Sequence, residues 1–215
     1  MAVTDAYATA ATYRAMLSKS DTAEDAEILT DLTAISRYIE RKLGRFFTTD
    51  ASNVTRVYQN TLYTNQPKTL FVDDLVSINT LKVDENDDGT FGESAWASTD
   101  YELLPRNAAD GPEPAPYTEL FIPPWSTKNL WGHHRVELNG KFGWPSVPSA
   151  IEQACVQLTS AIERACVQLT GILRLETPRG TRQVNIGAET VLETSEIAQD
   201  IVADLLNVYG KRSLF

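Results

Sequence analysis

The chain has 215 residues, of which 42% are hydrophobic, so it holds enough apolar side chains to build a core and is not expected to be disordered. Its 19 Lys and Arg residues against 29 Asp and Glu residues give a formal net charge of −10. Binding to nucleic acid phosphates needs clustered basic residues, so this charge argues against a protein that grips DNA or RNA. No apolar run approaches the roughly 20 residues that span a bilayer, and no secretory signal is visible, which predicts a soluble protein made inside the cell.

Two helices are predicted before residue 50. The Ala-rich stretch 7–17 predicts a short one, and the segment 21–44 predicts a longer one. Asp21 and Glu24 have the spacing of an acidic capping box, and Gly44 is a typical helix end. The longer helix is indicated by apolar residues that recur at spacings of three and four, namely Ile28, Leu32, Ile35, Ile39 and Leu43.

The segment 51–146 reads as strand-rich. Most of the 10 prolines of the chain lie between Pro67 and Pro145, a density that excludes long helices. Short runs of β-forming residues are separated by Pro, Gly, Asn and Asp, as expected for strands joined by turns. The predicted strands are Val54–Tyr58, Leu70–Val72, Val76–Val83, Tyr101–Leu104, Glu119–Ile122 and Arg135–Leu138.

A second long helix is predicted to begin at Ser149, which forms a capping box with Glu152, and to end before Pro178. It contains an internal duplication, because residues 151–159 recur almost unchanged as residues 162–170. Eleven residues make almost three helical turns, so the second copy keeps the same apolar face. The duplication therefore lengthens the helix without rotating its apolar stripe.

The last part of the chain predicts a hairpin over 182–191 and a final helix that Ser195 caps and Gly210 ends. Ile197, Ile201, Leu205 and Val208 form one stripe of this helix. The tail that follows ends in Leu214 and Phe215, which have no obvious burial within the chain and are better explained by a partner.

We therefore expect a mainly α (α+β) fold: a helical bundle of long helices, with a strand-rich insertion between the first and second long helices and a C-terminal docking helix. The whole chain is predicted to be a single domain. Its parts are the N-terminal helices at 1–50, the insertion at 51–146, the long helix at 147–178, and the hairpin, helix and tail at 179–215.

Motifs for catalysis are missing from the sequence. His133 and His134 are adjacent, without metal-ligand spacing, and no pair of carboxylates is singled out by a motif. Cys155 and Cys166 lie eleven residues apart in a predicted helix, about 16 Å, which is too far for a disulfide. We expect both thiols to be buried, and we expect no enzyme activity, no resident metal and no cofactor.

The acidic segment Asp84–Gly89 matches the first half of a calcium-binding EF-hand loop. The match then fails, because Ala95 stands where a bidentate glutamate is needed. A solvated turn is the favoured interpretation, and calcium binding stays open as an alternative. The aromatic residues Trp125, Trp131 and Trp144 favour core or subunit packing over a sugar or nucleotide site.

The order of these elements resembles that of the head-to-tail connector (adaptor) proteins of tailed bacteriophages. The family signature positions are Arg45, Phe46, Gly143, Trp144, Pro145 and Pro148. The resemblance covers most of the chain, and its individual motifs are signatures of packing and turns. They are the helix end Ile39–Phe47, Val83-Asp84 with the Gly89 turn, Tyr101–Pro105, the aromatic-Pro-x-x-Pro entry Gly143–Ile151, and the terminal segment Leu205–Arg212.

The resemblance implies a structural virion protein that forms a homo-oligomeric ring, usually of twelve subunits, at the neck of the particle. Such a ring binds the portal protein on one side and a stopper or tail-terminator protein on the other. Double-stranded DNA passes through it without specific binding, and an acidic wall would repel that DNA. The C-terminal segment would dock into the portal through Ile197, Ile201, Leu205, Tyr209, Lys211, Arg212, Leu214 and Phe215.

Three alternatives remain at this point: another neck or tail ring such as a stopper, a carboxylate-based hydrolase, and a calcium-binding module. The connector interpretation predicts that removal of residues 195–215 abolishes portal binding and leaves the fold intact.

Overall fold

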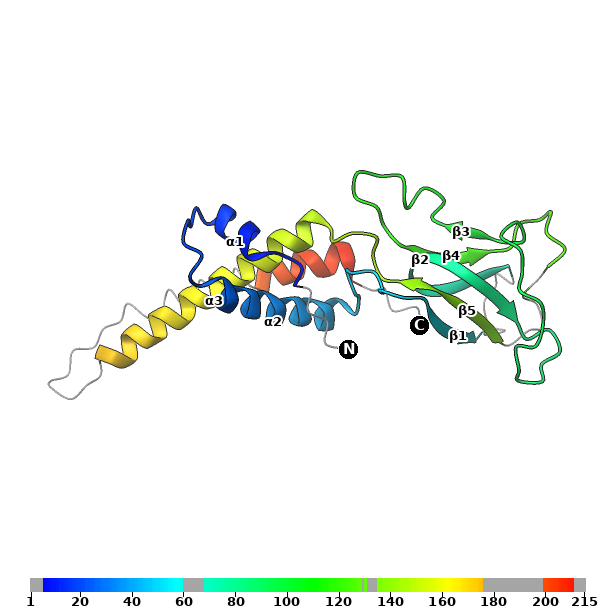
Figure 1. The fold of residues 1–215 in the computed structure, drawn as a ribbon, viewed down its shortest axis with the longest axis horizontal. Coiled ribbons are helices and arrows are strands. Elements are labelled where there is room, and N and C mark those ends of the chain that lie inside the picture. The colour runs from blue at the N-terminus through cyan, green and yellow to red at the C-terminus, as the bar shows by residue number, and fades with distance from the viewer. Residues whose placement is uncertain (1–5, 60–67, 129, 131–134, 176–198, 211–215) are drawn as a thin grey trace. The chain divides into compact units, whose positions relative to one another are not determined.

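A computed structural model describes residues 6–59, 68–128, 130, 135–175 and 199–210. The chain forms two compact units (Figure 1). Unit 1 consists of Met1–Arg45 and Pro148–Phe215, and unit 2 consists of Phe46–Val147. The prediction of a single domain is left open by this division.

Unit 1 is helical. Its elements are α1 (Ala10–Met16), α2 (Asp25–Leu43), α3 (Ser149–Leu175) and a further helix over 199–209. The Thr9 hydroxyl caps α1 by accepting from the Thr12 N–H at 3.0 Å. Gly44 ends α2 in the left-handed conformation, with its N–H donating to the Glu40 carbonyl, as predicted.

The predicted capping box at the start of α2 is wrong. Glu24 is the N-cap residue and makes no side-chain capping hydrogen bond, while the Asp21 carboxylate accepts from the Ala23 N–H inside the preceding turn. The apolar stripe is confirmed, because Ile28, Leu32 and Ile39 are buried. This stripe packs α2 against α3, whose own buried residues include Ile151, Cys155 and Leu158.

Unit 2 contains one five-stranded antiparallel sheet. Its strands lie in the order β1-β5-β2-β4-β3. They are β1 (Val54–Gln59), β2 (Thr69–Val83), β3 (Glu102–Leu104), β4 (Tyr117–Phe121) and β5 (Arg135–Phe142). The sheet encloses its own core, whose twelve buried residues are Leu70, Val72, Leu75, Leu81, Val83, Trp96, Leu120, Ile122, Leu130, Val136, Leu138 and Phe142.

The strand β2 is continuous where two strands were predicted. Its first half pairs with β4 as far as Leu75, and from Leu75 onward it pairs with β5. Irregularities in both registers accompany this change of partner. Asp73 and Asp74 break the apolar pattern in the sequence, but they lie inside the strand and bind neighbouring side chains.

The prediction of a mainly α bundle of long helices is wrong. The protein is α+β, with one unit built on a five-stranded antiparallel sheet and one unit built of helices. The physical reason is the core of unit 2: this unit, which lies in the chain between the two segments of unit 1, has a buried core of twelve residues, nine of them in the strands β2, β4 and β5.

The expectation that both cysteines are buried is wrong, because Cys155 is buried and Cys166 is exposed. The hairpin over 182–191 and the Ser195 cap lie outside the described residues.

Candidate functional site

The C-terminal helix over 199–209 carries apolar side chains on two faces. Leu205 is 7% exposed and lies in the interior of unit 1, while Leu206 and Val208 are 43% and 73% exposed. Ile201 and Tyr209 are half-buried. The helix ends before Gly210, whose N–H donates to the Leu206 carbonyl, as predicted.

The apolar surface that this helix offers to a partner therefore differs from the predicted stripe. Leu205 is committed to its own chain, and sequence reasoning did not select Leu206, which is exposed. The residues that complete the predicted portal-binding set lie outside the described residues; they are Ile197, Lys211, Arg212, Leu214 and Phe215.

The signature around Gly143 joins the two ends of unit 2. Gly143 has a φ of +105°, and its N–H donates to the Asp74 carbonyl at 2.8 Å. A Cβ at this position would lie 1.9 Å from the Thr48 carbonyl oxygen, so only glycine fits this close approach. The segment that enters unit 2 at Thr48 therefore lies directly against the segment that leaves it at Gly143.

Trp144 extends the same junction. It is buried, its ring packs on Phe47 with centroids 5.2 Å apart, and its Nε1–H donates to Asp74 at 3.3 Å. The Thr49 hydroxyl donates to the Trp144 carbonyl, and the Asp50 N–H donates to the Phe142 carbonyl. These bonds clamp the two crossing segments together.

The other signature residues have different surroundings. Pro148 is buried and its carbonyl accepts from the Ile151 and Glu152 N–H groups at the start of α3. Arg45 is half-buried and Pro145 is exposed. Phe46 is 60% exposed, directly beside the buried Phe47.

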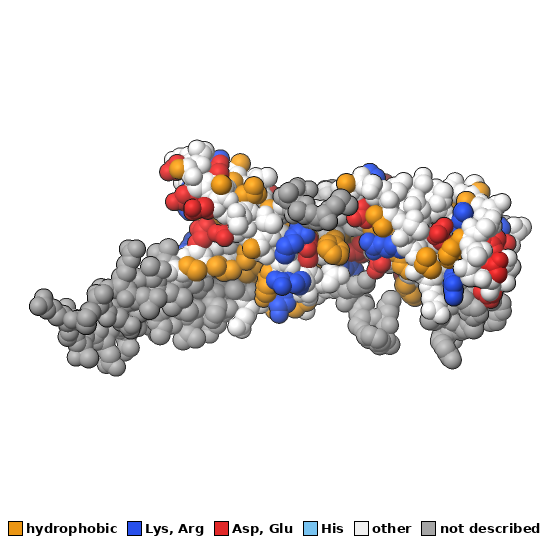
Figure 2. All heavy atoms as spheres, turned by 60° about the horizontal axis from the view of Figure 1, so that its bottom comes forward, with side chains coloured by type: hydrophobic (Ala, Val, Ile, Leu, Met, Phe, Trp, Pro, Cys, Tyr) orange, Lys and Arg blue, Asp and Glu red, His pale blue; other side chains and the backbone are white. Residues whose placement is uncertain are grey.

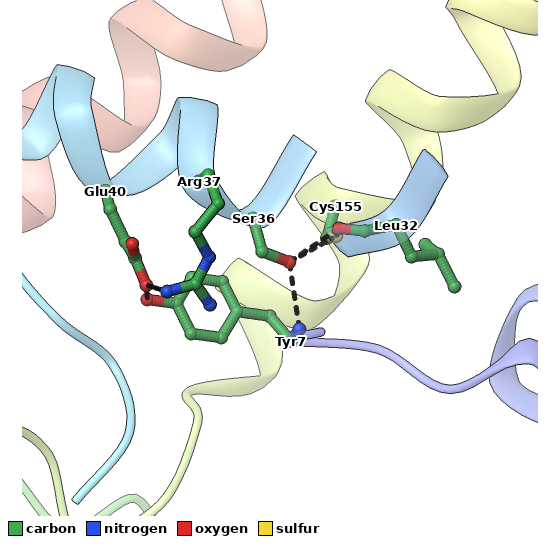
Figure 3. Close-up of polar contacts among 6 residues, drawn as sticks. All are labelled: Tyr7, Leu32, Ser36, Arg37, Glu40 and Cys155. Atoms are coloured by element: carbon green, nitrogen blue, oxygen red, sulfur yellow. Dashed lines mark hydrogen bonds and ion pairs between the residues drawn. The ribbon is translucent and has the colours of Figure 1, made fainter. Parts of the chain in front are cut away.

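A buried polar cluster in unit 1 fixes the N-terminal segment on α2 (Figure 3). The Tyr7 N–H donates to the Ser36 hydroxyl at 2.9 Å, and the Tyr7 hydroxyl donates to the Glu40 carboxylate. Arg37 pairs with the same carboxylate at 2.7 Å and lies over the Tyr7 ring. Tyr7, Ser36 and Glu40 are all buried, so these bonds hold the segment by its main chain and by its side chain.

Cys155 of α3 completes the cluster without being a reactive thiol. Its sulfur lies 3.4 Å from the Ser36 hydroxyl, and burial raises the pKa of its thiol. A thiol that is buried and protonated is a poor nucleophile. The group is therefore suited to packing and to positioning the chain, not to covalent catalysis.

Sequence reasoning missed this cluster. The available signal was the placement of Ser36 and Glu40 on the buried stripe of α2, four residues apart between Leu32 and Leu43. A carboxylate on an apolar stripe needs a partner, since burial without one is costly. What the sequence did not indicate is that the partner is Tyr7, 33 residues away.

The acidic segment after β2 is a closed turn. The Asp84 side chain is buried, and its two carboxylate oxygens accept from the Asp88 and Gly89 N–H groups at 3.1 and 3.0 Å. The Thr90 hydroxyl and N–H donate to Asp88 and lower the pKa of its carboxyl. The carboxylates of Asp84 and Asp88 thus hold the turn closed through hydrogen bonds to its own main chain.

No group of three or more metal-ligating side chains occurs among the described residues. Glu85, which borders the turn, accepts instead from the Trp96 indole at 3.1 Å and pairs with Lys128 at 2.8 Å. The Lys128 ammonium also lies over the Trp96 ring. This arrangement fixes the loop over the core of unit 2.

Comparison with protein-family models and with curated proteins found no match for the chain. Within the described residues, no helix is both long enough and apolar enough to cross a membrane.

Proposed function

We propose that the protein is a structural subunit of a phage-type head-to-tail connector, a ring at the particle neck that binds the portal on one side and a stopper or tail-terminator ring on the other. The proposal rests on the order of motifs along the sequence and on the surface of the C-terminal helix. The proposed subunit is not a bundle of long helices but consists of two units, one helical and one built on a sheet.

The observation that carries the proposal is that the helix over 199–209 has apolar side chains both on its buried side and on its exposed sides. Leu205 anchors the helix to unit 1, while Leu206 and Val208 remain exposed. A helix that is apolar on more than its inward face is suited to lie in a groove of a second protein. Portal docking through this helix therefore involves Leu206 and Val208, whereas Leu205 holds the helix in place.

Further exposed apolar side chains support contacts between subunits. In unit 1 these side chains include Leu29, Tyr38 and Ile162. Figure 2 shows hydrophobic side chains exposed on one face of the helical unit and acidic side chains gathered at one end of it. A ring needs two different faces of each subunit to meet its two neighbours.

The net charge of −10 suits a passage for DNA. Repeated around a ring, this charge would repel the phosphates and let the duplex slide without adhering. The same charge would not suit a protein that must hold DNA by itself.

The experiment measures binding of the purified chain to assembled portal rings by surface plasmon resonance. We expect Leu206→Asp combined with Val208→Asp to weaken binding by roughly 30-fold or more, as for central apolar residues of an interface. The matched control is Asn207→Asp, which adds a charge at an exposed position between them and removes no apolar group. Equal binding of all three proteins would refute portal docking through these two side chains.

Deletion of residues 195–215, the test of portal docking that followed from the sequence, is less specific than these substitutions. Leu205 is buried, so removal of residues 195–215 also exposes the interior of unit 1. Loss of portal binding by that truncated chain would not separate a lost contact from a weakened fold.

A further inference from the structure

The second half of β2 has one open edge. β4 pairs with β2 only up to Leu75, opposite Tyr117, and the rest of β2 pairs with β5 alone. The register with β5 shifts between Leu75 and Ser77 and again between Ile78 and Thr80, so Val76 and Asn79 have no partner residue in β5, and part of the main-chain groups over 76–80 face the open side. Among the described residues, no main-chain hydrogen bond joins 76–80 to β4 or to 98–103.

A groove of about 610 Å³ lies along this edge. β2 lines one side through Val76 and Ile78, and the segment 98–103 lines the other. At one end the groove is closed where Leu75 of β2 pairs with Tyr117 of β4. At the other end it is closed where the Trp96 N–H donates to the Leu81 carbonyl at 2.8 Å. Between these ends, five residues of β2 span about 16 Å at roughly 3.3 Å per residue.

The groove lining combines half-buried apolar side chains with a neutralised ion pair. Val76, Ile78, Tyr101, Leu103 and Tyr117 are each half-buried. The two charged residues of the lining bind each other, because the Arg106 guanidinium pairs with the Glu102 carboxylate at 2.5 Å. The lining of the groove therefore carries no net charge, which favours an uncharged occupant.

We propose that this groove is a docking site for an extended, uncharged segment of a partner protein, with apolar side chains at alternate positions, that pairs with β2 over 76–80. The segment would occupy the place that β4 vacates beyond Leu75. Its main chain would bind the open edge of β2, and its alternate side chains would cover the half-buried Ile78 and Tyr101. The proposal does not depend on the connector role.

The test uses the full chain and a defined probe, an acetylated and amidated hexapeptide of alternating threonine and valine. Titration is followed by the amide resonances of the ¹⁵N-labelled protein. We expect saturable shifts confined to residues 76–80 and 98–103. The control peptide has the same side chains but carries N-methyl groups on the amides that face β2, so it lacks the N–H donors for pairing. We expect it to bind at least tenfold more weakly than the unmethylated peptide.

Two variants separate a blocked groove from a damaged fold. Ser98 is exposed and lines the groove at a turn in which the Asp100 N–H donates to the Ala97 carbonyl, so Ser98→Trp fills the groove from its rim. Thr99→Trp places the same ring on the neighbouring exposed residue, which does not line the groove. We expect loss of peptide binding with the first variant and unchanged binding with the second.

The contrary outcomes are equally specific. Equal binding of the N-methylated peptide, or binding that survives Ser98→Trp, would contradict pairing with β2. Absence of shifts at saturating peptide would overturn the proposal. Shifts that grow with protein concentration without peptide would identify a second copy of the chain as the occupant, which also overturns it.

Discussion

At the scale of single residues, Tyr7 ties the beginning of the described chain to α2. Its N–H and its hydroxyl bind two different side chains, Ser36 and Glu40, one helical turn apart. Glu40 stays paired with Arg37 when the tyrosine hydroxyl is removed. The contribution of the Tyr7–Glu40 hydrogen bond can therefore be measured while the carboxylate keeps a partner.

We predict that Tyr7→Phe lowers the free energy of unfolding by about 2 kcal/mol, the usual contribution of a hydrogen bond to a charged group. Tyr38→Phe is the matched control, because Tyr38 lies on α2, the helix that carries Glu40, and is exposed; its change should stay within about 0.5 kcal/mol. Urea unfolding followed by circular dichroism measures both. Equal effects of the two substitutions would show that the Glu40 bond contributes nothing.

Tyr58 of β1 gives a prediction on pH. Burial, and then the nearby Asp73 carboxylate, raise the pKa of Tyr58 from 10.0 to about 12. The folded state therefore holds the phenolic proton more tightly than the unfolded state. The contribution of Tyr58 to stability is complete below pH 10 and is lost as the pH rises toward 12.

We therefore predict that the stability difference between the wild type and Tyr58→Phe shrinks as the pH rises from 10.0 to about 12. Other tyrosines also titrate in this range, and burial raises the pKa of Tyr13 and Tyr101 as well. Because both proteins contain these residues, their contribution cancels in the difference. A difference that stays constant over this range, measured by urea unfolding, would contradict a raised pKa for Tyr58.

At the scale of elements, the helices followed from the sequence better than the strands did. The repeat of apolar residues every three or four positions predicted α2 and α3, because each buries one face. The start of α2 was misjudged because a capping box is a local pattern, whereas the loop before α2 uses Asp21 for its own turn.

The strand β5 was predicted too short for a similar reason. Asn139 and Gly140 have the composition of a turn, and the predicted strand ended before them at Leu138. In the structure, a Cβ on Gly140 would lie 2.2 Å from the Ser77 carbonyl oxygen, so the glycine is required by close contact between β5 and β2. The sequence records the glycine but not the neighbouring strand that requires it.

The candidate site was predicted in part. Gly143 and Trp144 were selected as signature positions, and both lie at the junction that closes unit 2. Within the C-terminal helix, helical spacing alone did not decide which of its apolar faces packs inward. Leu205 is taken up by unit 1 and Leu206 is not, a distinction that depends on tertiary packing.

We predict that Gly143→Ala lowers the free energy of unfolding by about 3 kcal/mol or more, since the new methyl group meets the Thr48 carbonyl at a positive φ. Gly92→Ala is the matched control in the same unit. Its Cβ would meet only the Thr90 hydroxyl at 3.9 Å, and the change should stay within about 0.5 kcal/mol. Thermal unfolding of both variants checks this, and a stable Gly143→Ala protein would refute the clamp.

At the scale of the whole molecule, each unit has the means to hold itself together. The core of unit 2 lies entirely within 46–147, and the segments that enter and leave this unit bind each other through Trp144 and Thr49. Unit 1 brings α1, α2 and α3 together and fixes the N-terminal segment by the Tyr7 cluster.

We predict that a fragment of residues 46–147 folds by itself. Its ¹H–¹⁵N spectrum should show dispersed amide resonances, and the ring protons of Trp144 should show contacts with Phe47. A collapsed spectrum would mean that the sheet depends on unit 1 for its stability, in which case a single cooperative domain would describe the chain better.

The central claim is that this chain forms the ring at the neck of a phage-type particle, and an image of that neck tests it most directly. Cryo-electron microscopy of particles that contain the chain should show a closed ring of its copies between portal and tail, with Leu206 and Val208 of the C-terminal helix against the portal. A neck without this chain, or a ring whose C-terminal helices face solvent, would contradict the account.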